Sequence, residues 1–184
     1  MAAYPGARRG ELLNLRWSDV DLDGKQITIT GSAAFIDGER IEGTTKSGRK
    51  RIVSLDDGTI RVLKAQRSKQ AAGQERRGTD DHVFTTGWGE PIHPDTVSSL
   101  TATMIRRYNN PAKEPKPKEP LPHARLHDLR HIHATTPLLA GLPVHVVAAR
   151  LGHADPSITL HVYAHVIRAA EASAAGIFAE AIGE

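Results

Sequence analysis

Residues 126–163 read LHDLRHIHATTPLLAGLPVHVVAARLGHADPSITLHVY, and this segment decides the architecture of the second half of the chain. Apolar residues recur in it at helical spacing, and its breaks fall at Gly141 and Pro156. Glycine is favoured just past the end of a helix and proline in a first helical turn. The pattern therefore predicts helices over residues 127–141 and 143–151, and a third from Pro156 to the end of the segment.

Four polar side chains of this segment suit phosphate chemistry. His127 and Arg130 are three residues apart, so they share one helix face and can point at the same anion. A guanidinium group is a planar fork of donors that fits phosphate oxygens. His153 follows the second predicted helix, and Tyr163 has a hydroxyl that becomes a nucleophile if its anion is favoured. The segment thus combines potential anion ligands with a potential nucleophile.

Three motifs of the segment resemble the catalytic end of the tyrosine recombinases, also called phage integrases. HDLRHIHA resembles the H-x-x-R box of that family, LGHAD resembles its L-G-H box, and ITLHVYAH resembles the part that carries its nucleophilic tyrosine. Each motif alone is a modest signal. All three occur in the family's order and at the family's spacing, and together they form a strong signal.

A fourth motif lies at the start of the chain. YPGARRGELLNLRWSD resembles the family's first arginine box, T-G-x-R-x-x-E-L-x-x-L-x-W-x-D, with Arg8 at the matched arginine and Gly6 and Glu11 in register. Without the other motifs, Arg8 would be read as a surface residue at a helix start. Pro5 replaces the family's usual threonine. The resemblance implies that residues 1–184 form one catalytic domain, and that the family's N-terminal DNA-binding domain and the first helices of the catalytic domain are absent.

A small antiparallel sheet is predicted after this box. The turn at Asp23-Gly24 precedes a strand over residues 26–31, a second short strand lies near Phe35-Ile36 or Arg40-Ile41, and residues 51–55 form the third. The polar turn TTKSG lies before the third strand. It resembles the hairpin that carries the family's catalytic lysine, which implies Lys46, with Lys50 as the alternative; an exposed turn lysine is the non-functional interpretation.

The remaining segments complete an α+β, mainly α-helical fold with a three-stranded antiparallel sheet. Helices are expected over residues 56–77 and 94–108, and the proline-rich segment 109–122 is expected to be an extended loop. Pro137 lies inside the helix of residues 127–141, where a kink or a break is expected. Residues 166–182 have an apolar stripe at helical spacing, which predicts an amphipathic tail helix.

Composition limits the class of protein. The 184 residues include no cysteine, which excludes disulfides and thiol catalysis and fits a cytoplasmic location. Neither a signal peptide nor a membrane-spanning run is present. The net charge is +3, and the sequence pI is about 9.3. Histidine pairs at 131/133 and 161/165 lack a nearby acidic partner in a metal-binding arrangement, so no metal or cofactor is expected.

The resemblance implies the function and the role of each site residue. Double-stranded DNA is the expected partner, and the activity is site-specific recombination or integration for a phage or another mobile element. The tail, residues 166–182, is expected to mediate self-association on DNA. A DNA-binding fragment without independent activity and a type IB topoisomerase-like nicking and resealing activity are the alternatives. The implied roles are nucleophile for Tyr163, phosphate binding for Arg8 and Arg130, and proton donation to the leaving oxygen for Lys46. His127 and His153 are expected to hydrogen-bond the phosphate and to help with proton movement.

Overall fold

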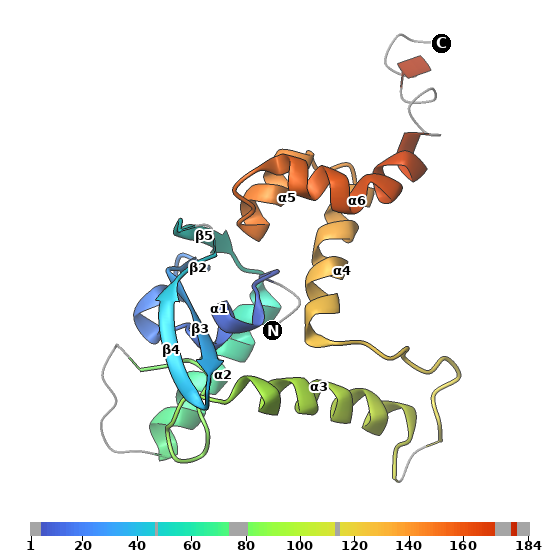
Figure 1. The fold of residues 1–184 in the computed structure, drawn as a ribbon. Helices are drawn as coiled ribbons and strands as arrows, with labels where there is room; N and C mark the ends of the chain where they lie inside the picture. Colours follow the sequence, from blue (N-terminus) through green and yellow to red (C-terminus); the bar gives the residue numbers. More distant parts are fainter. Residues whose placement is uncertain (1–4, 47, 74–80, 113–114, 172–177, 180–184) are drawn as a thin grey trace.

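The computed structural model of the chain describes residues 5–46, 48–73, 81–112, 115–171 and 178–179. Helices make up most of its regular structure, together with two small antiparallel β-units (Figure 1). In chain order the elements are α1 (Arg9–Leu13), the 3₁₀ helix η1 (Trp17–Asp19), β1 (Val20–Asp21), β2 (Gln26–Ile29), β3 (Gly31–Ile36), β4 (Glu39–Thr44), β5 (Arg51–Ser54), α2 (Asp57–Gly73), α3 (Pro94–Asn109), α4 (Leu126–Leu139), α5 (Val144–Leu151) and α6 (Pro156–Glu171). The predicted α+β, mainly helical fold class is confirmed.

The predicted three-stranded antiparallel sheet is also confirmed, with the strand order β1-β2-β5. In the central strand β2, Ile27 pairs with Val20 of β1 and with Val53 of β5. Ile27 and Ile29 are buried, whereas the residues next to them along the strand are only partly buried. This alternation is what a strand with one face toward a core requires, and it places the inward face against α2.

The predicted second strand was right in its position but wrong in its sheet partners. Phe35 and Arg40 both lie in strands, and they pair with each other in the separate hairpin of β3 and β4. The two residues of the turn, Asp37 and Gly38, have φ angles of 51° and 83°. Positive φ at both turn positions matches the twist of a two-residue hairpin, and Asp-Gly is a favoured pair there. The turn therefore makes two strands from a segment that the sequence analysis treated as one.

Two clusters of buried apolar side chains lie on opposite sides of the site described below. The first joins α1, the three-stranded sheet and α2, with Leu15, Ile27 and Leu63 at its centre. The second lies among α4, α5 and α6, with Leu151 and Tyr163 among its members. In Figure 1, α3 and the long connection after it lead from the first group to the second. No strand or helix of the described chain runs from the first cluster into the second. The N-terminal segment therefore contacts the α4–α6 group through side chains such as Arg130.

Two expectations for the C-terminal half are settled only in part. The break expected at Pro137 does not occur, because α4 continues through it and ends at Leu139. α6 extends past Tyr163 to Glu171, while most of the remaining tail up to residue 182 lies outside the described residues. Among the residues that the structure describes, none of the helices combines the length and the hydrophobicity needed to span a bilayer.

Candidate active site

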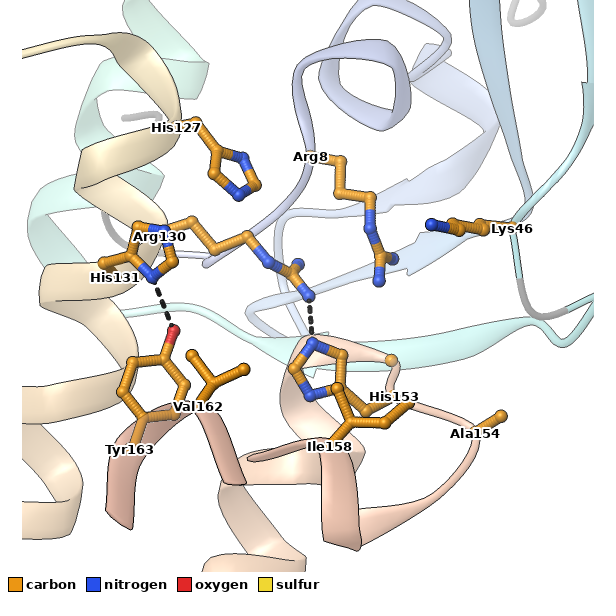
Figure 2. Close-up of a pocket in the computed structure, with 11 residues that line it drawn as sticks. Arg8, Lys46, His127, Arg130, His131, His153, Ala154, Ile158, Val162 and Tyr163 are labelled. Carbon is orange, nitrogen blue, oxygen red and sulfur yellow. Dashed lines mark hydrogen bonds between the residues drawn. The ribbon is translucent and has the colours of Figure 1, made fainter. Parts of the chain in front are cut away.

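Arg130 of α4 is buried and points into the cavity of Figure 2. Only 4% of its surface is exposed, and its guanidinium donates to two backbone carbonyls, Gly6 O at 2.6 Å and Leu151 O at 2.7 Å. Burial, followed by the charge of Arg8, lowers the pKa of Arg130 to about 10. Arg130 is therefore still protonated near neutral pH, and it is a positive charge fixed by backbone contacts from two distant parts of the chain.

Gly6 brings the N-terminal segment close to α4. Its φ angle is +59°, a left-handed conformation that glycine adopts at little cost. A Cβ atom at this position would lie 2.5 Å from Cδ2 of His133 and 3.1 Å from the Leu151 side chain. A glycine is therefore required both for the backbone conformation and for the close approach that lets the Gly6 carbonyl accept from Arg130.

Arg8 precedes α1 and is positioned by Glu11. The backbone N–H of Arg8 donates to Glu11 Oε2 at 2.8 Å, and its Nη1 donates to Oε1 at 2.9 Å. Glu11 is 1% exposed and also accepts two hydrogen bonds from Arg51, at 3.0 and 2.7 Å. Burial would raise the pKa of Glu11, but the hydrogen bonds and charges of Arg51 and Arg8 hold it below its ordinary value. The ionised carboxylate thus orients Arg8 toward the cavity.

Lys46 reaches the same cavity from the loop between β4 and β5. Its side chain extends toward Arg8 in Figure 2. The loop is held by a hydrogen bond from Thr45 Oγ1 to Arg49 O at 2.8 Å and by one from Gly48 N to Thr45 O at 2.8 Å. Thr45 is 3% exposed, whereas Lys46 is exposed. The buried threonine therefore anchors a turn from which the lysine ammonium projects.

His153 follows the end of α5. The helix terminates at Gly152, which has φ 71° and ψ 38°, so the next residue turns back toward α4. His153 Nε2 lies 3.1 Å from Arg130 Nη2, and its Nδ1 lies 2.7 Å from Thr159 Oγ1. Because a guanidinium can only donate, Nε2 must accept, and the proton of the neutral ring is on Nδ1. Burial and then the charge of Arg130 lower the pKa of His153 to about 4, which keeps this tautomer uncharged.

Tyr163 lies at a kink of α6, where its φ of −110° and ψ of 16° depart from helical values. The side chain is 4% exposed, and its hydroxyl lies 2.9 Å from Nδ1 of His131 (Figure 2). Burial raises the pKa of the phenol, and the charge of Arg130 only partly opposes this rise. The charge of Arg130 therefore does not by itself produce a phenolate.

The structure brings all six sequence-predicted site residues to one cavity of about 380 Å³. Arg8 and Lys46 come from the sheet side, and His127, Arg130, His153 and Tyr163 come from the helical side (Figure 2). The lining includes two guanidinium groups and an ammonium group but none of the carboxylates of the described chain. Such a cavity suits an anion with several oxygen atoms, placed beside a phenol.

A second cavity continues the first along the molecule. It shares Arg8, Lys46 and His127 with the first, and it adds the basic Arg9, His93 and the carboxylate of Asp95. The partly basic lining therefore extends beyond the group that surrounds Tyr163, and a polyanion longer than one phosphate could follow it.

The histidine pair at positions 131 and 133 does not form a metal site. His131 faces Tyr163, whereas Nε2 of His133 accepts from Nε of Arg150 at 2.8 Å. Within the described ranges, no three histidine or acidic side chains are grouped closely enough to hold a metal ion.

Three residues of this network were not predicted as site residues. Glu11 and Arg51 connect Arg8 to the C-terminal end of α5, because Nε of Arg51 also donates to Arg150 O at 3.0 Å. Glu11 stands in the first arginine box, and Arg51 follows the TTKSG turn closely in the sequence. His131 follows Arg130 directly, but its contact with a residue 32 positions away depends on the packing of α6 and has no local sequence signal.

Comparison with known proteins identifies relatives of this arrangement. The model of the phage integrase family matches residues 1–169. A tyrosine recombinase XerC-like protein of Caldanaerobacter subterraneus is 31% identical over 91% of the chain and 44% of its own length, and the integrase of Staphylococcus phage L54a is 29% identical over 89% of the chain and 46% of its own length. The chain thus spans less than half the length of these relatives.

Solved structures share the fold. The Tn1549 transposon integrase, in complex with circular intermediate DNA, superposes with a TM-score of 0.73 at 19% identity, over 86% of the chain and 51% of that protein. XerA recombinase superposes with a TM-score of 0.64 at 23% identity, over 86% of the chain and 48% of that protein. The fold of the chain is therefore that of the tyrosine recombinase catalytic domains.

Proposed function

The chain belongs to the phage integrase family, and from this premise we propose that it is the catalytic domain of a site-specific DNA recombinase. It cleaves and rejoins DNA strands through a 3′-phosphotyrosyl intermediate. The observation that carries this proposal is the single cavity in which Tyr163 lies beside Arg8, Arg130 and Lys46. A nucleophile, two bidentate phosphate ligands and an ammonium proton donor are the groups that metal-free phosphodiester cleavage requires.

In the proposed reaction, the Tyr163 oxygen attacks the phosphorus and forms an O–P bond. The bond from phosphorus to the 5′ oxygen breaks, and Lys46 gives that oxygen a proton. Arg8 and Arg130 bind the non-bridging oxygens, whose charge they stabilise as it develops. His127 and His153 hydrogen-bond the phosphate. A 5′ hydroxyl of another strand then reverses the sequence, and no ATP is needed because the bond energy is kept in the phosphotyrosyl link.

Double-stranded DNA is the proposed partner. The Tn1549 integrase is a fold relative solved with DNA, and the basic lining of the two adjoining cavities supports a similar use here. Affinity that rests on phosphate contacts falls steeply with salt concentration. Because the chain spans less than half of its curated relatives, binding is best measured at low salt and high protein concentration.

The proposal is tested by trapping the covalent intermediate. The probe is a library of nicked suicide duplexes with randomised base pairs around the nick, since the target sequence is unknown. The short strand downstream of the cleavage point diffuses away after attack, so the adduct accumulates and its DNA can be sequenced. We expect a slow-migrating adduct from the parent chain and none from Tyr163→Phe. A parent chain that binds DNA and forms no adduct would be a DNA-binding domain only.

Supercoiled plasmid distinguishes the remaining alternative. Relaxed topoisomers without recombinants from a two-site plasmid would indicate nicking and resealing like that of a type IB topoisomerase. Recombinant products from two copies of a sequenced target would support recombination.

We also propose that the tail mediates self-association on DNA. α6 continues beyond Tyr163 to Glu171, so the position of the nucleophile is mechanically linked to whatever the tail contacts. Deletion of residues 167–184, followed by light scattering with and without a bound duplex, tests this. A mass per complex that the deletion leaves unchanged would exclude the tail as the assembly element.

A further inference from the structure

We propose that His131 is the general base that removes the phenolic proton of Tyr163 during attack, an inference that rests on the proposed recombinase function. Nδ1 of His131 and the Tyr163 hydroxyl are 2.9 Å apart, which is hydrogen-bond distance. The two rings lie 5.9 Å apart at an angle of 62°. His131 therefore touches a reacting atom directly.

The geometry separates His131 from the other two histidines of the site. His153 uses Nε2 to accept from Arg130 and Nδ1 to contact Thr159, so both of its nitrogens have partners other than the tyrosine. His127 stands one helical turn before His131, with the two rings 5.0 Å apart and perpendicular. It lines the part of the cavity that continues toward Arg9, whereas Tyr163 lines only the first cavity. Of the three, His131 is the histidine that faces the nucleophile.

A phenol in this environment needs a base. Tyr163 is 4% exposed, so bulk water has little access to its proton. Burial raises its pKa more than the charge of Arg130 lowers it. Loss of the proton before attack is therefore unfavourable, and transfer to a neighbouring group during attack avoids a free phenolate.

The proton balance of the step is complete. As the Tyr163 oxygen forms its bond to phosphorus, the O–H electron pair stays on oxygen and the proton moves to Nδ1 of His131. The bond to the 5′ oxygen breaks, and that oxygen takes a proton from Lys46. In the reverse step the imidazolium of His131 returns its proton to the tyrosine, and Lys46 accepts the proton of the attacking 5′ hydroxyl. One base and one acid thus serve both directions.

The groups around His131 come from several helices. On α4 it interacts electrostatically with Asp128 and with His127. From α6 it faces Tyr163. α5 directs Arg150 to His133 instead, and α3 approaches the N-terminal end of α4, where Ser98 lines a cavity with His127. The nearby carboxylate can stabilise the proton that His131 gains.

Two substitutions separate proton acceptance from positioning. His131→Ala removes the contact, and His131→Asn places an amide oxygen near the position of Nδ1, where it accepts a hydrogen bond but cannot take up a proton. We expect single-turnover cleavage to fall roughly a hundredfold in both, the scale of a lost general base. His161→Ala, on the exposed face of α6 two residues before Tyr163, is the matched control and should cleave at the parent rate.

Two further measurements, one with a modified substrate and one at varied pH, would be unaffected if His131 had only a structural role. A DNA substrate with a bridging sulfur at the 5′ position has a leaving group that needs no proton. It should restore cleavage by Lys46→Ala but not by His131→Ala. The pH profile of the cleavage rate should differ between the parent chain and His131→Asn, because only the parent chain carries a base beside Tyr163.

The outcomes are distinct. Parent-like cleavage by His131→Asn, or restoration of His131→Ala by the sulfur substrate, would overturn the general-base assignment while the recombinase proposal stands. A parent chain that forms no adduct would overturn both. Slow cleavage by both His131 variants on both substrates, with a normal His161→Ala control, supports the assignment.

Discussion

The two halves of the molecule are stabilised in different ways. Around the three-stranded sheet, eleven buried apolar residues of the described chain form one cluster, which extends from α1 through β2 and β5 to α2. Among α4, α5 and α6 the corresponding cluster has five members, and one of them is Tyr163. Several large apolar side chains of this second half are more than 40% exposed, among them Ile132, Leu139 and Val162.

In the helical half, polar contacts to distant segments compensate for the smaller apolar cluster. Arg130 binds two backbone carbonyls, one of them 124 residues away in sequence, and Arg51 of the sheet half binds the carbonyl of Arg150. Buried charged hydrogen bonds are costly to break, because the group left behind stays desolvated. The sheet half therefore has an apolar core that is separate from its two candidate site residues, Arg8 and Lys46, whereas in the helical half Arg130 and Tyr163 both stabilise the fold and line the cavity.

The largest effect on cleavage is expected at Tyr163, where one substitution separates the role in the fold from the role in the site. Tyr163→Phe keeps the aromatic ring in the second cluster and removes only the hydroxyl. We expect adduct formation on the suicide library to be abolished, while the free energy of unfolding falls by about 1 kcal/mol for the lost hydrogen bond to His131. Urea unfolding of parent and variant measures the second quantity. A stability loss above about 3 kcal/mol would mean that the hydroxyl is chiefly structural.

The two arginines sharpen the comparison. Arg130→Lys cannot reproduce the bidentate fork, so we expect cleavage to slow roughly a hundredfold or more. It also leaves a carbonyl of Gly6 or Leu151 without its donor, which should cost about 2 kcal/mol of stability. Arg8→Lys is the matched control, because the side chain of Arg8 is 25% exposed and contacts a carboxylate. It should slow cleavage with a stability change of about 0.5 kcal/mol. Equal losses of unfolding free energy in Arg130→Lys and Arg8→Lys would contradict the view that the two halves are stabilised in different ways.

The sequence motifs predicted six of the residues that line the candidate site. His127 and Arg130 lie on one turn of one helix, so their proximity follows from spacing alone. The proximity of these two residues to Arg8 does not follow from spacing, because it depends on the approach of the Gly6 carbonyl to α4. Only the resemblance to the family indicated that Arg8 lies near them. The tyrosine recombinase motifs thus carried long-range information that periodicity lacks.

The errors have local physical causes. Asp37-Gly38 is a hairpin turn of two positive φ angles, and it joins two strands where the sequence analysis expected one, near Phe35-Ile36 or near Arg40-Ile41. Pro137 stands two residues before the end of α4, so the one helical hydrogen bond that it removes, to the carbonyl of His133, lies in the last turns and the helix continues to Leu139. His131 was considered only as a metal ligand, because its partner Tyr163 becomes its neighbour through helix packing that leaves no signal near either residue.

An effect on stability is expected where the two halves are joined. Glu11→Gln keeps the shape of the side chain but removes the charge that pairs with Arg8 and Arg51, which should cost about 3 kcal/mol at pH 7. The folded-state pKa of Glu11 lies below its unfolded value of about 4.3. Its stabilisation is therefore fully present above pH 4.3 and is lost as the pH falls through the folded pKa. Urea unfolding at pH 7, 5 and 3.5 should show the parent and the variant converging in acid. A constant difference would mean that shape, not charge, matters.

The smallest expected effect concerns His153, whose pKa is about 4 in the folded chain against about 6.5 when unfolded. Between these values the unfolded chain binds a proton that the folded chain does not. The stability of the parent should therefore be complete above pH 6.5 and decrease as the pH falls toward 4. His153→Gln should show a shallower decrease in urea unfolding between pH 7 and 5, and exposed His161→Gln should not. Because Arg130 is a main cause of the low pKa, an anion in the cavity should raise it, and added phosphate should then reduce the parent's slope toward that of the variant. A slope that phosphate leaves unchanged would show that the buried arginine does not meet the anion.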